Sequence, residues 1–144
     1  NELDAQPRTA LADSQSLIDT PAALAVWRYL LATPAWHGTP VWIHADLLRP
    51  NLLVESGRLY AVIDFGGAGV GDPAADVIAA WSGFGPAGRA AFRTALGVDD
   101  PTWHRACGYA LHQAALIIPY YSETNPAFVA LARRTIAQIL SDPW

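Results

Sequence analysis

The stretch VWIHADLLRPN at positions 41–51, followed by DFG at positions 64–66, decides the fold of this chain. It contains the pattern His-x-Asp-x4-Asn, formed by His44, Asp46 and Asn51. Short β-prone runs flank these polar side chains, so we expect them to lie in loops at the ends of strands. Such loops bring carboxylates and an amide to one point, which suits a divalent metal ion and a phosphate group.

Three short strands are predicted around this pattern. Residues 41–43 form the first, and the apolar runs 51–55 and 58–63 form a hairpin around a Ser-Gly turn at 56–57. The Asp of the first motif therefore precedes the hairpin. The Asp of the DFG stretch follows it.

The residue types fit phosphoryl transfer from a nucleotide. Mg²⁺ prefers carboxylate, amide and water oxygens and neutralises charge on the phosphates, and Asn51 and Asp64 supply such oxygens. The reaction also needs an acceptor hydroxyl in line with the γ-phosphate. A carboxylate at Asp46 is placed to orient that hydroxyl and to take its proton.

At these residues the chain resembles the kinase-like small-molecule phosphotransferases, and in particular the aminoglycoside phosphotransferase family. The resemblance implies that Asp46 is the catalytic residue and that Asn51 and Asp64 bind Mg²⁺ and, through it, the nucleotide. It further implies transfer of the γ-phosphoryl group of ATP or GTP to a hydroxyl of an aminoglycoside-like small molecule.

The segment GDPAAD at positions 71–76 is similar to a further motif of that family. The resemblance implies that its second Asp, Asp76, opens a helix and braces the catalytic loop, while capping of the helix accounts for Asp72. For His44 two interpretations stand: a metal ligand or general base, or a structural role with its ring hydrogen-bonded beneath the loop. We expect the structural role.

Two positions depart from related patterns. Ala45 stands where the family most often has Gly, a change that we expect to leave the loop intact but to remove access to unusual φ angles. Leu48 stands where protein kinases have Lys, and no Ala-Pro-Glu segment follows DFG. A protein substrate is therefore disfavoured.

The nucleotide-clamping half of a kinase-like enzyme is not recognisable. No Gly-rich strand-turn-strand precedes position 41, and the sequence contains neither Lys nor Met. We therefore expect residues 1–144 to be a single domain, the C-terminal lobe of a longer polypeptide whose N-terminal lobe is absent and without which the piece is inactive. An N-terminally processed protein of this natural length is the alternative.

Composition limits the function classes. The net charge is −4 and the basic residues form no run beyond Arg133 and Arg134, so no nucleic-acid partner is expected, whereas a cationic substrate suits the charge. No stretch approaches a membrane span. The single Cys107 excludes an internal disulfide and agrees with a reducing compartment, so we expect a cytoplasmic location. The 52% hydrophobic content and six Trp suggest that some apolar surface faces a missing part.

The predicted fold is α+β and mainly helical: a short β-hairpin on a helical bundle, as in a kinase-like C-terminal lobe. Residues 1–18 give a mixed signal. Start signals of the Asp-Pro or Asn-Pro kind and a terminating Gly97 define the helices. They are expected at 22–31, 73–81, 86–96, 101–121 and from 126 onward. Apolar stripes on the last two, including Cys107, are assigned to the core.

Other polar residues keep two interpretations. Arg49 either contacts phosphate or substrate or is a solvated loop residue, and Glu123 either lines an acidic substrate cleft or lies on the surface. The remaining His residues have no partner at metal-ligand spacing. Two other function classes are alternatives: a non-catalytic kinase-like binding module, and a metal-dependent phosphohydrolase. The second lacks the further His and Asp ligands of a two-metal site.

Overall fold

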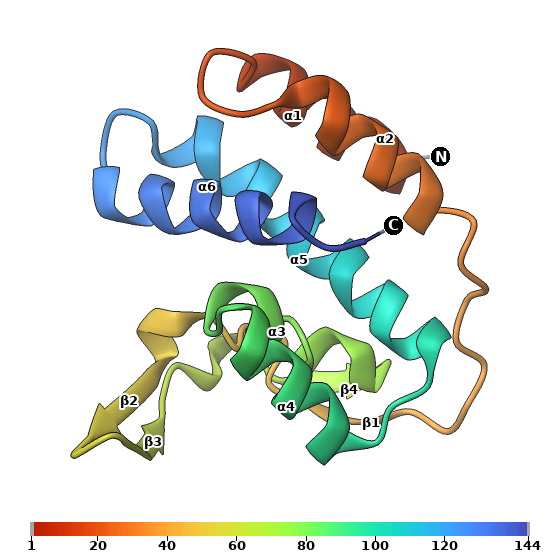
Figure 1. Cartoon of the computed structure of the whole chain (residues 1–144), viewed down its shortest axis with the longest axis vertical. Helices are drawn as coiled ribbons and strands as arrows, with labels where there is room; N and C mark the ends of the chain where they lie inside the picture. Colours follow the sequence, from red (N-terminus) through yellow and green to blue (C-terminus); the bar gives the residue numbers. More distant parts are fainter. Residues whose placement is uncertain (1, 144) are drawn as a thin grey trace.

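The computed structural model describes residues 2–143 and the side chains from residue 4 onward, and it is an α+β fold dominated by helices (Figure 1). The predicted fold class is confirmed. The α-helices are α1 (Glu2–Asp13), α2 (Thr20–Leu30), α3 (Ala79–Ser82), α4 (Pro86–Leu96), α5 (Asp100–Tyr121) and α6 (Pro126–Leu140). The strands are β1 (Val41–Ile43), β2 (Leu52–Glu55), β3 (Arg58–Val62) and β4 (Gly69–Gly71). Three 3₁₀ turns complete the description: η1 (Arg49–Asn51), η2 (Phe65–Gly67) and η3 (Pro73–Asp76).

Side-chain caps begin three of the predicted helices where the sequence placed them. The carboxylates of Asp19 and Asp99 and the amide oxygen of Asn125 each accept a hydrogen bond from the backbone N–H three residues further on, at 2.8–3.1 Å. A proline follows each cap within two residues, where its missing N–H costs nothing. Gly97 ends α4 in the left-handed conformation, with φ 63°.

Two helical predictions need correction. No helix was predicted within residues 1–18, where the sequence signal is mixed, but the structure has the helix α1 there, with Pro7 inside it. The continuous helix predicted over 73–81 is instead the 3₁₀ turn η3 followed by the single turn α3. Backbone N–H groups there bond to the carbonyl three residues back, as from Val77 to Ala74 and from Trp81 to Ile78. This tighter winding brings Asp76 to the loop that follows β1.

The strands form two separate antiparallel pairs, β1 with β4 and β2 with β3. The hairpin β2–β3 turns at Ser56 and Gly57, whose φ angles of 50° and 76° are the positive values of a two-residue hairpin turn. Asn51, predicted in a strand, lies in η1 instead, because the preceding Pro50 favours the turn. The strand β4, rich in glycine, carried no sequence signal.

The core is centred on α5, which packs against α1, α2, α6 and η3. The predicted stripe on this helix is buried throughout: Trp103, Cys107, Ala110, Leu111, Ala114 and Ile118. Burial raises the pKa of the Cys107 thiol well above its ordinary range, so it stays protonated and unreactive. No helix in the described part of the chain combines the length and the apolar character needed to cross a bilayer.

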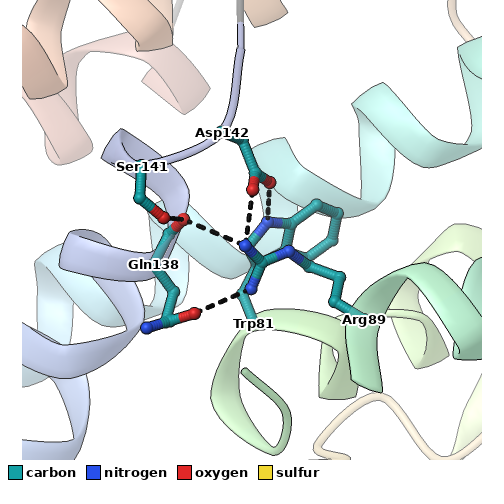
Figure 2. Close-up of polar contacts among 5 residues, drawn as sticks. All are labelled: Trp81, Arg89, Gln138, Ser141 and Asp142. Atoms are coloured by element: carbon teal, nitrogen blue, oxygen red, sulfur yellow. Dashed lines mark hydrogen bonds and ion pairs between the residues drawn. The ribbon is translucent and has the colours of Figure 1, made fainter. Parts of the chain in front are cut away.

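A buried polar cluster fastens the end of α6 to α3 and α4 (Figure 2). The Arg89 guanidinium, 4% exposed, donates to the side chains of Asp142 and Gln138. Asp142 also accepts a hydrogen bond of 2.8 Å from the indole of Trp81. The Arg charge is therefore compensated although it lies inside the protein.

The hairpin β2–β3 projects away from the helices (Figure 1). Large apolar side chains on the strands are exposed, with Trp42 at 81% and Tyr60 at 73%. The strands thus contribute little to the core. Their main effect is to hold the loops between them.

Candidate functional site

The loop that follows β1 is fixed by a carboxylate from η3. The two oxygens of Asp76 accept hydrogen bonds from the backbone N–H groups of His44 and Ala45, each at 2.8 Å. Hydrogen bonds to a charged acceptor are stronger than those between neutral groups. Asp76 therefore sets the path of the backbone immediately before Asp46.

Ala45 adopts the conformation that the sequence had argued against. Its φ is 66°, in the left-handed region, although an alanine there is less favourable than a glycine by about 1–2 kcal/mol. The expectation that alanine would remove access to unusual φ angles is wrong. The hydrogen bond from its N–H to Asp76 offsets the strain.

His44 joins this loop to the one that follows β3. Its ring is buried, Nε2 lies 2.9 Å from the carbonyl oxygen of Ile63, and Nδ1 accepts the backbone N–H of Asp46 at 3.3 Å. Since Nδ1 accepts, the proton must lie on Nε2, which donates to Ile63. The ring also packs on Phe65, with centroids 4.6 Å apart. Both nitrogens are thus engaged within the protein.

Asp46 lies between two amide donors. Asn51 Nδ2 donates to both the backbone oxygen and Oδ2 of Asp46, at 2.9 Å each. Gln113 Nε2, from α5, donates to Oδ1 at 2.6 Å. Gln113 was missed by the sequence analysis, because it lies on a helix far along the chain and no motif contains it. Its place one residue from the buried helix stripe was the single available signal.

Asn51 and Asp64 are brought together by the hairpin. The N–H of Ile63 donates to the carbonyl of Asn51 at 3.0 Å. Asp64 directly follows Ile63, so it lies close to Asn51. Asp64 has φ 62° and an exposed side chain that does not cap η2. Asn51 donates from its amide nitrogen to Asp46, which leaves the lone pairs of its amide oxygen available to bind a metal ion.

These two side chains fit a magnesium ion by their chemistry. Both present oxygen atoms, and Mg²⁺ is usually held by one or two protein oxygens together with phosphate oxygens and water. Across residues 2–143 no group of three or more His, Cys, Asp or Glu side chains forms a metal site by itself. The described residues therefore contain no metal site made entirely of such side chains, and a metal ion held by Asn51 and Asp64 would need further ligands from phosphate or water.

Asp72 both caps η3 and pairs with α5. It accepts the N–H of Ala74 at 3.0 Å and the Nε of Arg105 at 2.7 Å, with both charged side chains 11% exposed. The ion pair holds η3, and with it Asp76, against the long helix. Arg105 was not identified from the sequence.

A large open groove lies beside Asp46. Its volume is about 1110 Å³ and it runs between α1, η3 and α5. Ala45 and Gln113 both line it, so the groove reaches the loop that carries Asp46. Arg49 is exposed and borders a smaller groove near the start of α6, away from the first. Glu123 is exposed.

The fold and the paired loops are consistent with the C-terminal lobe of a kinase-like phosphotransferase. A family model described as the phosphotransferase enzyme family matches residues 2–109, and this chain belongs to that family. The family resemblance predicted from the motifs is confirmed. Neither the comparison with curated proteins nor that with solved structures found a match.

Proposed function

We propose that this chain is the C-terminal lobe of a Mg²⁺-dependent enzyme that transfers the γ-phosphoryl group of ATP or GTP to a hydroxyl of a small molecule. The observation that carries the proposal is the position of Asp46, which Asn51 and Gln113 hold at the edge of a large groove. Membership of the phosphotransferase family supports the general reaction class. The proposal includes a cytoplasmic location, where both nucleotide and reduced thiols are found.

Asp46 is the proposed catalytic residue. Each carboxylate oxygen has two lone pairs. Oδ1 can therefore accept a hydrogen bond from the hydroxyl of a substrate in the groove, in addition to or in place of the one from Gln113. In that position the carboxylate orients the hydroxyl and takes its proton as the phosphoryl group transfers. Because two amides and the loop fix its geometry, little reorganisation is needed.

Asn51, through its amide oxygen, and Asp64 are the residues that would hold Mg²⁺. When bound, the ion supplies positive charge that neutralises the nucleotide phosphates. Asp46 stays separate from this pair because Asn51 places its nitrogen, not its oxygen, toward Asp46. The amide of Asn51 thus divides the acceptor side from the metal side.

The nucleotide-clamping lobe of the same polypeptide is the proposed partner of the exposed strand surface. Trp42 on β1, Tyr60 on β3 and Phe65 in the DFG stretch are at least 59% exposed. Exposed apolar surface of this kind commonly marks an interaction site. No role for nucleic acid or a membrane is part of the proposal.

The central test replaces the base in the full-length polypeptide. Asp46→Asn keeps the shape and the hydrogen bond from Gln113, loses the side-chain hydrogen bond from Asn51 and removes the proton acceptor, so nucleoside diphosphate release should fall roughly 100-fold to 10,000-fold. Nucleotide affinity, measured by calorimetry, should stay within about twofold of wild type. Asp100→Asn, an exposed carboxylate on α5, is the matched control and should keep full turnover. Phosphorylation of the acceptor at the wild-type rate by Asp46→Asn would refute the role.

A further inference from the structure

The residues that line the groove beside Asp46 limit which acceptor it can bind. Gln113 connects Asp46 to the groove, because its amide lies 2.6 Å from Asp46 Oδ1 and the same side chain lines the groove. A compound seated in the groove therefore lies next to the proposed base. The chemistry of the groove wall then limits which hydroxyl compounds can be bound there.

A single carboxylate lines this groove among the described residues. It is Asp13, and no Arg of the described part of the chain lines the groove. The carboxylates Asp46, Asp72 and Asp76 are not part of this lining: Asp72 is paired with Arg105, Asp76 accepts two backbone N–H groups of the loop, and Asp46 is the proposed base that the acceptor hydroxyl contacts. Asp13 is exposed and forms no ion pair within the described part of the chain.

Aromatic and aliphatic side chains make up most of the remaining wall. Tyr109, Tyr120 and Tyr121 line the groove on the α5 side together with Leu116 and Ile117. Tyr120 is 77% exposed and its ring packs edge-on against Tyr121, with centroids 4.7 Å apart. Such surfaces gain free energy by covering apolar area of a ligand.

His112 adds a neutral side chain to this wall. Its Nε2 is shielded from solvent and has no hydrogen-bond partner among the described residues. Burial lowers the pKa of His112 below its ordinary value of 6.5, so the ring is uncharged at neutral pH. Because Nε2 is shielded even from water, His112 contributes an uncharged ring to this wall and no hydrogen bond to a ligand in the groove.

We propose that the acceptor is a hydroxylated compound with a broad apolar face and at most one cationic amine, and that a polyamine is a poor substrate. This inference rests on the proposed function, and it narrows the aminoglycoside-like expectation. A single amine pairs with Asp13, whereas each further ammonium group would lose water against an apolar wall without a partner. The groove volume of about 1110 Å³ is sufficient for a drug-sized molecule.

Calorimetric titration of the chain tests the inference without nucleotide. Two probes are used: erythromycin, a macrolactone with a single tertiary amine, and kanamycin, an aminosugar with several primary amines. Erythromycin should bind at least roughly tenfold more tightly, because apolar burial drives its binding. Kanamycin binding that is equal or tighter, or the absence of saturable erythromycin binding, would overturn the inference.

Variants locate the binding to the groove. Tyr120→Ser should weaken erythromycin binding roughly tenfold through lost apolar contact, and Asp13→Asn roughly threefold to tenfold through loss of the amine partner. The matched controls Tyr29→Ser and Glu55→Gln change an exposed tyrosine and an exposed carboxylate outside the groove and should bind as wild type. Unchanged binding by Tyr120→Ser, with the fold intact by circular dichroism, would contradict the assignment.

The same titration separates this inference from the proposed function. Asp46→Asn should retain erythromycin binding while losing phosphoryl transfer in the full-length polypeptide. If erythromycin binds in the groove but no nucleotide-dependent phosphorylation of any hydroxyl is found, the proposed function fails and the binding preference stands. If phosphorylation is found for polyamines alone, the proposed function stands and the acceptor class fails.

Discussion

The helical part of the molecule and the strand-and-loop part are stabilised in different ways. On the helices, buried side chains are mostly apolar and form one continuous core around α5. Between residues 41 and 71, by contrast, the buried side chains are His44, Leu48 and Asn51. Two of these three are polar. The site is therefore held by hydrogen bonds to specific partners, and the helices supply most of the hydrophobic stability.

This difference separates stability from chemistry within one small fold. Asp76 and Gln113 belong to segments packed on the core, and they reach into the loop that carries Asp46. The helices thus act on the site through two polar side chains. Substitutions in the helical part should change the free energy of unfolding, whereas substitutions at these polar contacts should change turnover more than stability.

The largest effect on stability is expected at the buried cluster of Figure 2. Asp142→Ala leaves the Arg89 guanidinium buried without its anion and should lower the free energy of unfolding by about 3–5 kcal/mol, measured by urea titration. Asp100→Ala removes the partner of the more exposed Arg93 and should cost about 1 kcal/mol or less. Equal losses for the two variants would show that burial does not set the value of these pairs.

Asp76→Asn sharpens the comparison from the side of the site. The amide keeps one acceptor oxygen but turns a donor toward one of the two loop N–H groups, so stability should fall by about 1–3 kcal/mol. Turnover of the full-length polypeptide should fall by more than tenfold, since a small misplacement of the base is costly. Glu55→Gln, an exposed carboxylate on β2, should change neither. A loss of stability with normal turnover would show that the loop keeps its geometry unaided.

Ala45→Gly should stabilise the loop slightly. Glycine removes the left-handed strain of about 1–2 kcal/mol at φ 66° but loses about 0.5–1 kcal/mol of backbone entropy, leaving a net gain of about 0–1.5 kcal/mol. Ala25→Gly, at an exposed position inside α2, has no such strain and should destabilise by about 0.5–1 kcal/mol. Thermal melts of both variants test whether the signs are opposite.

The smallest effect is a dependence of stability on pH through His112. Burial lowers the pKa of its folded state below 6.5, so near and below that pH the unfolded chain binds the proton more readily than the folded one. This contribution is complete above pH 6.5 and is lost as the pH falls toward the folded pKa, by at most about 1.4 kcal/mol per pH unit. Melts at decreasing pH should show a shallower decline for His112→Gln than for wild type or for the exposed-site control His37→Gln.

Much of the fold was predictable from local chemistry. The caps at Asp19 and Asn125, the terminating Gly97 and the Ser-Gly turn at 56–57 each have a conformation that the residue type favours. The apolar stripe on α5 was predictable because a helix repeats every 3.6 residues. The strand β4 was not, since pairing with β1, and not the propensity of its glycines, makes it a strand.

The site was only partly predictable. Sequence motifs contain His44, Asp46, Asn51 and Asp64. Asp76 also belongs to a motif, GDPAAD, and it forms the predicted hydrogen bonds to the loop that carries Asp46. Gln113 and Arg105 reach their partners from α5, and no local pattern relates a helix position to a loop far from it in sequence. The left-handed Ala45 is set by Asp76 against its own preference, so residue type alone gave the wrong expectation.

The hydrogen bonds of His44 make the loops of Asp46 and Asp64 a single mechanical unit. One ring nitrogen is bonded to the backbone of each loop, so neither loop can shift without straining the other. If the proposed ion and acceptor bind at these two loops, their binding is thermodynamically coupled. Any ion that orders Asp64 would improve the affinity for an acceptor at Asp46 by some factor, and the acceptor would improve ion binding by that same factor.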